Sequence, residues 1–199
     1  MLLAEIDDRY RFDGYTDKAA SEAKTLRNVL KDGDAWFNTG DLITEGDVGF
    51  SMGKPHYQFV DRIGDTFRWR SENVSTNEVG EILNANSQVE IANVYGVDVP
   101  ATEGKAGMAS IALNPGQVFD PLEFADYVSE NLPGFAQPVF VRIQTDLTTT
   151  GTFKLVKGDL RKQSFHIEQV GNDTIYVMMP RTNSYQILDQ ALYGSIMDG

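Results

Sequence analysis

Apolar residues recur at helical spacing in three parts of the chain. In residues 16–30 they return every three or four positions, behind a Thr-Asp pair that can cap a helix, and Gly33 then supplies a stop. A second helix is predicted to begin at Ser75 or Thr76. A third is predicted from Pro121 and ends at a Pro-Gly pair.

Shorter runs rich in aromatic and β-branched residues predict strands. These runs lie at 35–37, 58–62, 66–70, 89–99, 107–113, 139–143 and 175–179. Turn-forming residues join the fourth run to the fifth and predict a hairpin, and residues 188–196 resemble a short helix. Strands and helices that alternate around one sheet predict an α/β (α+β) fold between about residues 62 and 169.

Composition narrows the possible partners. The chain has 199 residues, which fits one domain and a piece of another, and its 29 acidic and 17 basic residues give a net charge of −12. That charge opposes general binding to nucleic acid or to anionic lipid. Without cysteine, and with His56 and His166 far apart in sequence, no metal site is predicted. No apolar run approaches the roughly 20 residues that span a bilayer.

Three short motifs hold the residues with candidate chemistry: WFNTGD at 36–41, a run of alternating apolar and charged residues at 60–79, and TGTFK at 150–154. Asp41 follows a Thr-Gly turn, where its carboxylate can accept two hydrogen bonds from the hydroxyls of a ribose. Aspartate is also a common turn residue, and its position alone favours a role in stabilising its own turn.

Two basic residues in these motifs can likewise have either a ligand-binding role or a structural one. Arg62 can bind ribose oxygens or a carboxylate, or it can form a surface ion pair with Asp61 or Asp65. Lys154 can set a cation against a carboxylate or an α-phosphate, or it can be a solvated loop lysine. Spacing does not choose between these roles.

The three motifs, in this order, resemble those of adenylate-forming enzymes. Their wording is similar to that of the long-chain and very-long-chain acyl-CoA synthetases of the fatty acid transport protein group. The resemblance implies that Asp41, with Thr39 and Gly40, and Arg62 bind the ribose of AMP or ATP. It also implies that Lys154 is the catalytic lysine, although Thr-Phe stands here where many relatives have Ser-Gly before the lysine.

The same resemblance implies a moving lid. Gly64 occupies the hinge position between a large domain and a C-terminal lid, and Arg70, Ser71 and Glu72 would line the pantetheine path of CoA. Ser71 replaces a glycine that many relatives have, so its side chain could crowd that path. From the residues alone, Arg70 is predicted to lie in a strand, on the same face as Arg68. Two arginines on one face are as typical of a solvated strand face over a packed tryptophan as of a CoA-binding surface.

The resemblance also divides the chain. Residues 1–61 would end the N-terminal AMP-binding domain, 62–170 would form the lid, and 171–199 would be a tail packed on the lid. The first residues read as the middle of a strand with no preceding element to pair with it, and they carry no export signal. The chain is therefore expected to lack a large N-terminal domain that precedes it.

The function implied is the C-terminal part of a fatty-acid–CoA ligase that forms an acyl-adenylate and then the CoA thioester, with ATP, Mg²⁺ and CoA. The missing part would hold most of the ATP and Mg²⁺, so this chain alone is expected to be inactive. A cytoplasmic place with peripheral contact at membranes is implied. Two alternatives are a stand-alone, lid-like binding or regulatory module and an inactive truncated product.

Overall fold

The structure is a computed structural model that describes residues 1–46, 49, 53–144, 157–180 and 182–199. The chain divides into two compact units, Met1–Gly64 and Asp65–Gly199. Arg62 therefore lies in the first unit, whereas the sequence placed it at the start of the next domain. The reason is local: Arg62 ends a strand whose only partner strand begins at Asp41.

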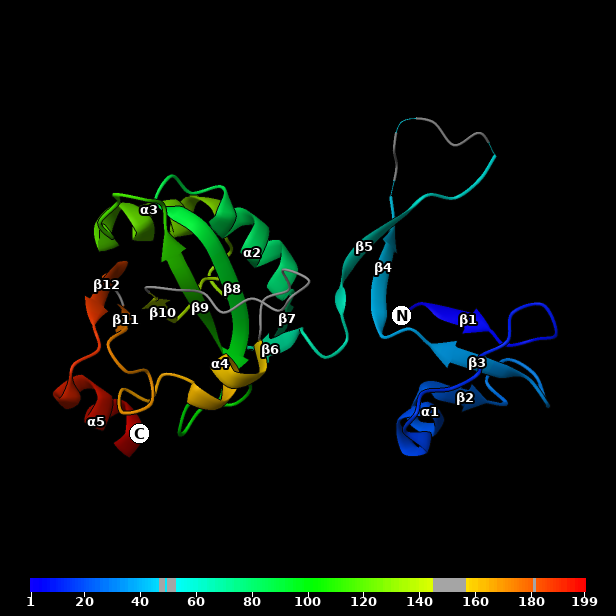
Figure 1. Cartoon of the computed structure of the whole chain (residues 1–199). Helices are drawn as coiled ribbons and strands as arrows, with labels where there is room; N and C mark the ends of the chain where they lie inside the picture. The colour runs from blue at the N-terminus through cyan, green and yellow to red at the C-terminus, as the bar shows by residue number, and fades with distance from the viewer. Residues whose placement is uncertain (47–48, 50–52, 145–156, 181) are drawn as a thin grey trace. The chain divides into compact units, whose positions relative to one another are not determined.

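The first unit consists of short strands and one helix (Figure 1). Its elements are β1 (Leu3–Glu5), α1 (Lys18–Lys24), β2 (Thr25–Arg27), β3 (Ala35–Asn38), β4 (Asp41–Glu45) and β5 (Tyr57–Arg62). β3 is the middle strand of an antiparallel sheet with β1 and β2, and β4 pairs with β5. The expected strand at 35–37 is confirmed, and that at 58–62 is confirmed with one residue more.

The helix expected over 16–30 is only partly right. It begins as predicted, with the carboxylate of Asp17 accepting the amide N–H of Ala19 at 2.9 Å, but it ends at Lys24. The chain then becomes a strand in which Leu26 lies opposite Trp36. Sheet pairing has overridden helical spacing, because the apolar residues after Lys24 gain a partner strand that an isolated helix would not give them.

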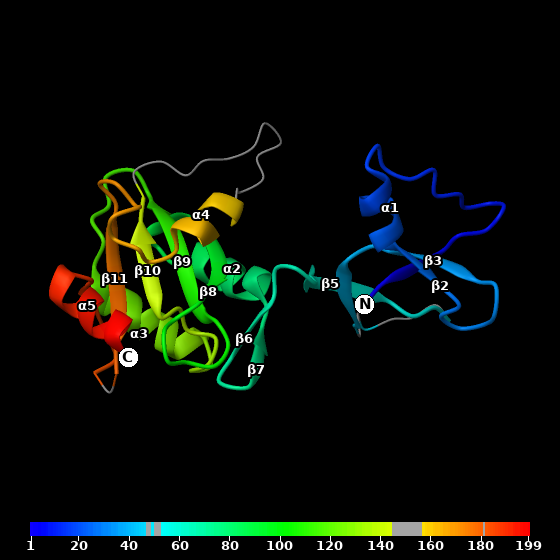
Figure 2. The same cartoon turned by 90° about the horizontal axis from the view of Figure 1, so that it is seen from below.

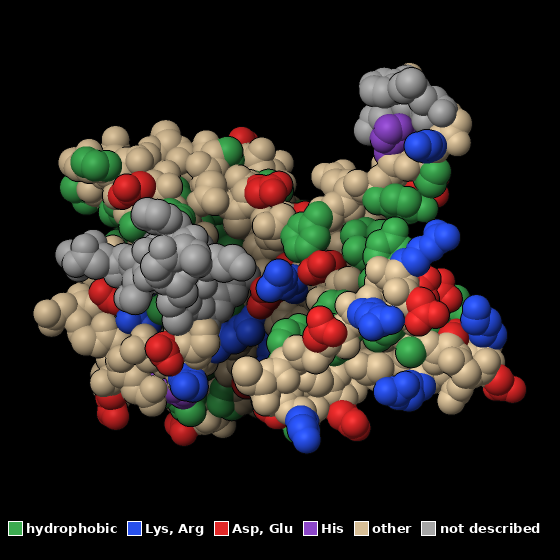
Figure 3. All heavy atoms as spheres, turned by 45° about the vertical axis from the view of Figure 1, so that its right-hand side comes forward, with side chains coloured by type: hydrophobic (Ala, Val, Ile, Leu, Met, Phe, Trp, Pro, Cys, Tyr) green, Lys and Arg blue, Asp and Glu red, His purple; other side chains and the backbone are tan. Residues whose placement is uncertain are grey.

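The described residues of the first unit include no buried hydrophobic side chain. Among its described residues only Asp34 and Asp61 are buried. Large hydrophobic side chains are exposed instead: Met1, Leu2, Tyr10, Tyr15, Val29, Leu30, Tyr57, Phe59 and Ile63. Figure 3 shows hydrophobic side chains open on this unit among charged side chains of both signs. An exposed apolar surface of this extent is typical of a region that another protein segment covers.

The second unit is built on a five-stranded sheet of order β12-β11-β10-β9-β8 (Figures 1 and 2). The strands are β8 (Val89–Val97), β9 (Ala106–Leu113), β10 (Phe140–Ile143), β11 (Thr174–Met179) and β12 (Ser184–Ile187). Neighbours are antiparallel except β9 and β10. A small hairpin of β6 (Phe67–Trp69) and β7 (Glu72–Val74) precedes the sheet.

Four helices accompany this sheet: α2 (Thr76–Asn84), α3 (Pro121–Asn131), α4 (Lys157–Gln163) and α5 (Gln190–Asp198). The starts predicted for α2 and α3 are confirmed. Ser75 caps α2 by accepting the amide N–H of Glu78 at 3.2 Å, and Pro121 follows the cap Asp120 in α3. β12 and α4 were not predicted.

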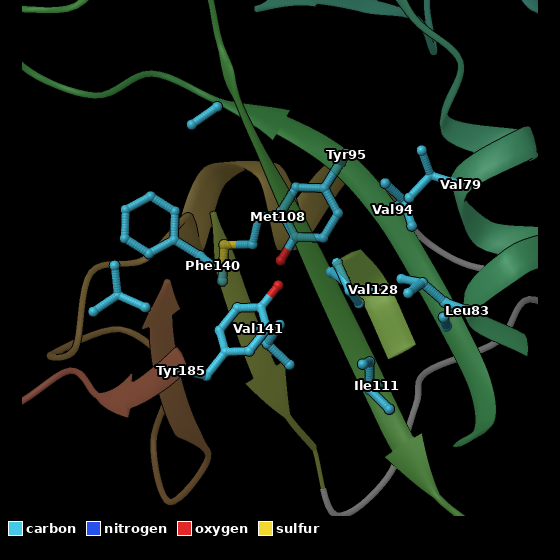
Figure 4. Packing of buried hydrophobic residues seen from close by; sticks show 14 of the residues in the cluster. Val79, Leu83, Val94, Tyr95, Met108, Ile111, Val128, Phe140, Val141 and Tyr185 are labelled. Atoms are coloured by element: carbon cyan, nitrogen blue, oxygen red, sulfur yellow. The ribbon is translucent and has the colours of Figure 1, made fainter. Parts of the chain in front are cut away.

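The core fills both faces of the sheet. On one face Val79 and Leu83 of α2 pack against Val94 (Figure 4). Tyr95 is the next residue of β8 and therefore points to the other face, where its hydroxyl lies 2.8 Å from Ser110 Oγ. All residues of the core cluster lie between Phe67 and Leu188, so the core belongs to the second unit alone.

Candidate functional site

Asp41 and Arg62 lie close together in the first unit. They are opposite each other in the first pair of β4 and β5, and Arg62 Nε lies 3.5 Å from Asp41 Oδ1. The arginine side chain is 62% exposed and the aspartate side chain 27% exposed. Asp41 Oδ1 is covered and accepts no hydrogen bond from the described residues. The carboxylate of Asp41 is thus mostly covered, whereas the Arg62 side chain is largely exposed. A ligand can therefore displace Arg62 from Asp41.

The turn before Asp41 does not need its carboxylate. Asn38 Oδ1 accepts the amide N–H of Gly40 at 3.0 Å, and Thr39 Oγ1 accepts the amide N–H of Asp41 at 3.1 Å. The Thr39 hydroxyl also donates to the Leu2 carbonyl at 2.9 Å. Gly40 has φ +82°, a conformation that favours glycine. Asn38 and Thr39 thus hold the turn, and the carboxylate of Asp41 remains available for another role.

The observed ion pairs differ from those that the sequence suggested between Arg62 and Asp61 or Asp65. Its side chain pairs with Asp41, while Asp61 Oδ1 accepts the backbone N–H of Arg62 at 2.8 Å. Asp65 pairs instead with Arg161 of α4, at 2.8 Å. Asp65 follows Gly64, the last residue of the first unit, so the expected hinge glycine stands at the boundary between the units.

Asp34 fixes the loop that leads into β3 and the WFNTGD motif. Its Oδ2 accepts the indole N–H of Trp36 at 2.8 Å, and its two oxygens also accept the amides of Val29, Leu30 and Lys31. Burial raises the pKa of this carboxyl, but the four hydrogen bonds outweigh it and lower the pKa to about 2. The sequence offered no signal for Asp34 beyond its place before a strand.

The loop should therefore keep its structure as the pH falls, until the pH reaches about 2. Because the pKa of Asp34 is lower in the folded chain, its contribution is fully present above the ordinary pKa of 3.8 and is lost as the pH falls through about 2. The indole ¹H–¹⁵N resonance of Trp36 should shift with a midpoint near pH 2. The Asp34→Asn variant should show no such transition, whereas a midpoint near 4 would contradict the assigned hydrogen bonds.

Of the residues expected on the CoA path, Arg70 and Ser71 form a tight turn, and Glu72 begins β7. β6 ends at Trp69, which pairs with Glu72, and the intervening Arg70 and Ser71 have φ of +50° and +67°. The expectation that Arg70 shares a strand face with Arg68 is therefore wrong. Two-residue hairpin turns of type I′ require positive φ at both residues, and this backbone conformation changes the direction of the Arg70 side chain. Its guanidinium carbon lies 5.9 Å from the ring centre of Trp69.

Lys154 and the TGTFK motif lie outside the described residues. The elements on either side are described, and α4 is held firmly. Arg142 of β10, 4% exposed, donates from Nη1 to Gln163 Oε1 of α4 at 2.6 Å and from Nε to Asp173 Oδ2 at 2.7 Å. Sequence reasoning missed Arg142, although a single arginine inside an apolar strand is a signal that a buried partner exists.

The described residues do not gather three acidic or histidine side chains where a metal ion could bind. Within the same part of the chain, no helix is long and apolar enough to cross a membrane.

Comparisons with known proteins find similar sequences and structures. Residues 78–154 match the AMP-binding enzyme C-terminal domain. The chain is 44% identical over 185 residues, 93% of its length, to the medium/long-chain fatty-acid–CoA ligase FadD6 of Mycobacterium tuberculosis, and covers 30% of that protein. It is 40% identical over its whole length to long-chain fatty acid transport protein 5 of Mus musculus, and covers 28% of it.

Among solved structures, the chain resembles o-succinylbenzoate CoA synthetase from Bacillus subtilis in complex with its acyl-adenylate intermediate. The match has a TM-score of 0.57 and 25% identity over 76% of this chain and 27% of that one. The expected mixed fold, a sheet with flanking helices, is confirmed. The chain spans about three tenths of the length of the curated relatives above. Residues 78–154 therefore match an AMP-binding enzyme C-terminal domain, and the resemblance to long-chain fatty acid transport proteins and fatty-acid–CoA ligases is confirmed over 93% or more of the chain.

Proposed function

We propose that this chain is the C-terminal part of a ligase that activates long or very long fatty acids as acyl-adenylates and transfers the acyl group to CoA. Residues 1–61, together with Arg62 at the end of β5, would form the end of the large AMP-binding domain. The second unit would be the lid of that domain, and the segment 171–199 would be part of the lid. ATP, CoA and a fatty acid are the co-reactants in this proposal. No step is assigned to Mg²⁺, because its ligands would come mainly from the preceding domain.

The observation that carries the proposal is the Asp41–Arg62 pair. The turn residues leave the Asp41 carboxylate free of its own turn, and an exposed guanidinium stands 3.5 Å away. A carboxylate can accept both hydroxyls of a ribose, and a guanidinium can donate to the same oxygens. Thr39 and Gly40 shape the turn that presents the carboxylate.

The surface of the first unit supports the proposal that a larger domain precedes it. A unit of 64 residues without a buried hydrophobic residue among those described, and with exposed side chains such as Leu30 and Tyr10, has little means to offset the entropy of ordering its chain. The missing core would come from the preceding domain. The purified chain alone would then be inactive, since the parts that hold the phosphates and the acyl chain are absent.

The lid carries the remaining roles. Lys154 would stabilise negative charge during adenylate formation, and a rotation about Gly64 would then withdraw it and bring the turn of Arg70, Ser71 and Glu72 to the incoming thiol. In this way one active site could serve both half-reactions. The fixed anchorage of α4 by Arg142 supports a lid that moves as one body.

The test is Asp41→Asn in a longer ligase that ends in this chain, for example a chimera in which this chain replaces the matching part of FadD6. The change keeps the shape and removes the charge, so kcat/KM for ATP should fall about 10-fold to 100-fold, the worth of one or two hydrogen bonds to a charged group. Asp32→Asn, an exposed aspartate of the same unit, is the matched control.

An active Asp41→Asn chimera with an unchanged kcat/KM for ATP would remove the ribose role. Fatty-acid activation by the purified chain without the upstream domain would refute the proposed division of labour. Tight AMP binding by the chain alone would favour the stand-alone module instead.

A further inference from the structure

The second unit contains a cavity of about 700 Å³, and apart from Arg70 the proposed chemistry uses none of the described residues that line it. It lies where the start of β10 and the end of β11 meet α5, beside the turn that follows β6. Most of its lining is apolar, with Val177, Met178, Met179, Leu192 and Ile196 among the contributors. A cavity of this size and lining is within the usual range for sites that bind small molecules.

The described part of the lining carries a single charge. Among the described residues that line the cavity, Arg70 is the only charged one. Arg70 is exposed and forms no ion pair with any described residue, although the chain has 12 more acidic than basic residues. Its contact with the Trp69 ring holds the guanidinium at the cavity. The cavity therefore offers one anion-binding group and an apolar interior.

The polar side chains of the lining are mostly engaged elsewhere. Gln137 donates from Nε2 to the Leu132 carbonyl at 3.0 Å, and Asn183 donates from Nδ2 to Ser129 Oγ at 3.3 Å. A ligand with many polar groups would thus find few partners in the cavity. A nucleotide with several phosphates needs several cations, and the described lining residues supply one.

We propose that this cavity binds a long-chain fatty acid, with the carboxylate at Arg70 and the aliphatic chain between β11 and α5. The two methionines suit a flexible chain, since their side chains adapt to irregular shapes. Each methylene that enters the cavity should raise the affinity about fourfold until the cavity is full. All of the described lining residues belong to the second unit, and occupation of the cavity needs no catalytic activity.

The cavity contains its own reporter, Trp69. In the chain of 199 residues, Trp36→Phe leaves Trp69 as the only tryptophan. Titration with cis-parinaric acid, a polyene fatty acid that absorbs tryptophan emission, should quench Trp69 saturably below its micellar concentration. Palmitate should reverse the quenching and octanoate should do so only weakly. Absence of saturable quenching would overturn the proposal, as would displacement by CoA but not by palmitate.

The role of the Arg70 charge is tested by comparing palmitate with its methyl ester, and Arg70 with the neighbouring Arg68. Arg70→Gln should weaken binding of palmitate about threefold to fivefold, the range for an exposed ion pair, and should leave binding of its methyl ester unchanged. Arg68→Gln, in the same hairpin but outside the lining, should change neither. Equal losses for acid and ester, or for the two variants, would overturn the assignment of Arg70.

Blocking the apolar end gives an independent result. Ile196→Asp places a carboxylate in the lining and should weaken binding of acid and ester more than tenfold. The matched control is Ile187→Asp, which makes the same change at an isoleucine of β12 that is 59% exposed and outside the lining. Circular dichroism confirms that each variant is folded. Unchanged binding in folded Ile196→Asp would refute the site, and if that variant unfolds, the Arg70 comparison still decides.

Discussion

Gly104→Ala should lower the free energy of unfolding of the second unit by about 3 kcal/mol or more. A Cβ at this position would lie 2.3 Å from the carbonyl oxygen of Arg68, a backbone atom that cannot rotate away. The same carbonyl accepts the amide N–H of Lys105 at 2.7 Å, so a shift that relieves the clash also breaks a hydrogen bond. Gly104 also has φ +87°, where alanine is strained even without a neighbour.

A second glycine separates these causes. Gly116 has φ +82°, nearly that of Gly104, but nothing lies within 4 Å of its ideal Cβ. Gly116→Ala should therefore cost only the strain of the positive φ, about 1 kcal/mol. Urea unfolding of both variants, followed by the circular dichroism of the second unit, measures the difference. Equal losses would mean that the approach of Arg68 to Gly104 contributes nothing to stability.

The close approach matters for the candidate site because it supports the turn of Arg70. Gly104 forms a bridge with Trp69, the residue on whose ring the guanidinium lies. When this contact is lost, the β6–β7 hairpin loses its attachment to the loop before β9. The proposed fatty-acid cavity and the proposed CoA turn should therefore both weaken in Gly104→Ala, although neither ligand would touch residue 104.

The sequence predicted well those elements whose pattern and caps agree. α2 and α3 have an apolar face, a capping side chain and, in α3, a proline in the first turn, so local and tertiary preferences coincide. The helix expected over 16–30 fails after Lys24 because β3 offers backbone pairing there. Spacing within the segment cannot reveal a partner strand that comes eight or more residues later.

The motifs indicated which residues to consider for the candidate site, but not how those residues are arranged. The motifs identified Asp41 and Arg62, yet not that they are opposite partners in one two-stranded ladder, since β4 is short and follows directly on a turn. Arg70 was expected in a strand, because the positive φ angles of the turn are carried by Arg and Ser rather than by glycine. Arg142 and Asp173 meet across 31 residues, a distance that no local pattern spans.

Lys154→Ala should have the largest effect on activity. In the longer ligase described above, we expect adenylate formation to slow about 10²-fold to 10³-fold, the usual cost of removing one group that stabilises developing charge. Thioester formation from supplied acyl-adenylate should stay close to the unmodified rate, because the proposed rotation about Gly64 takes the lysine away from the reacting atoms in that step.

The two half-reactions distinguish this role from a structural one. Pyrophosphate exchange measures adenylate formation, and CoA consumption with supplied acyl-adenylate measures the second step. Lys162→Ala is the matched control, since Lys162 is 80% exposed in α4 and pairs only with the exposed Asp159 among the described residues. A lysine that merely keeps its loop in place would slow both steps equally when removed. A selective loss of the first step would instead require that the lid present different residues to the two reactions, which is the central claim of the proposed function.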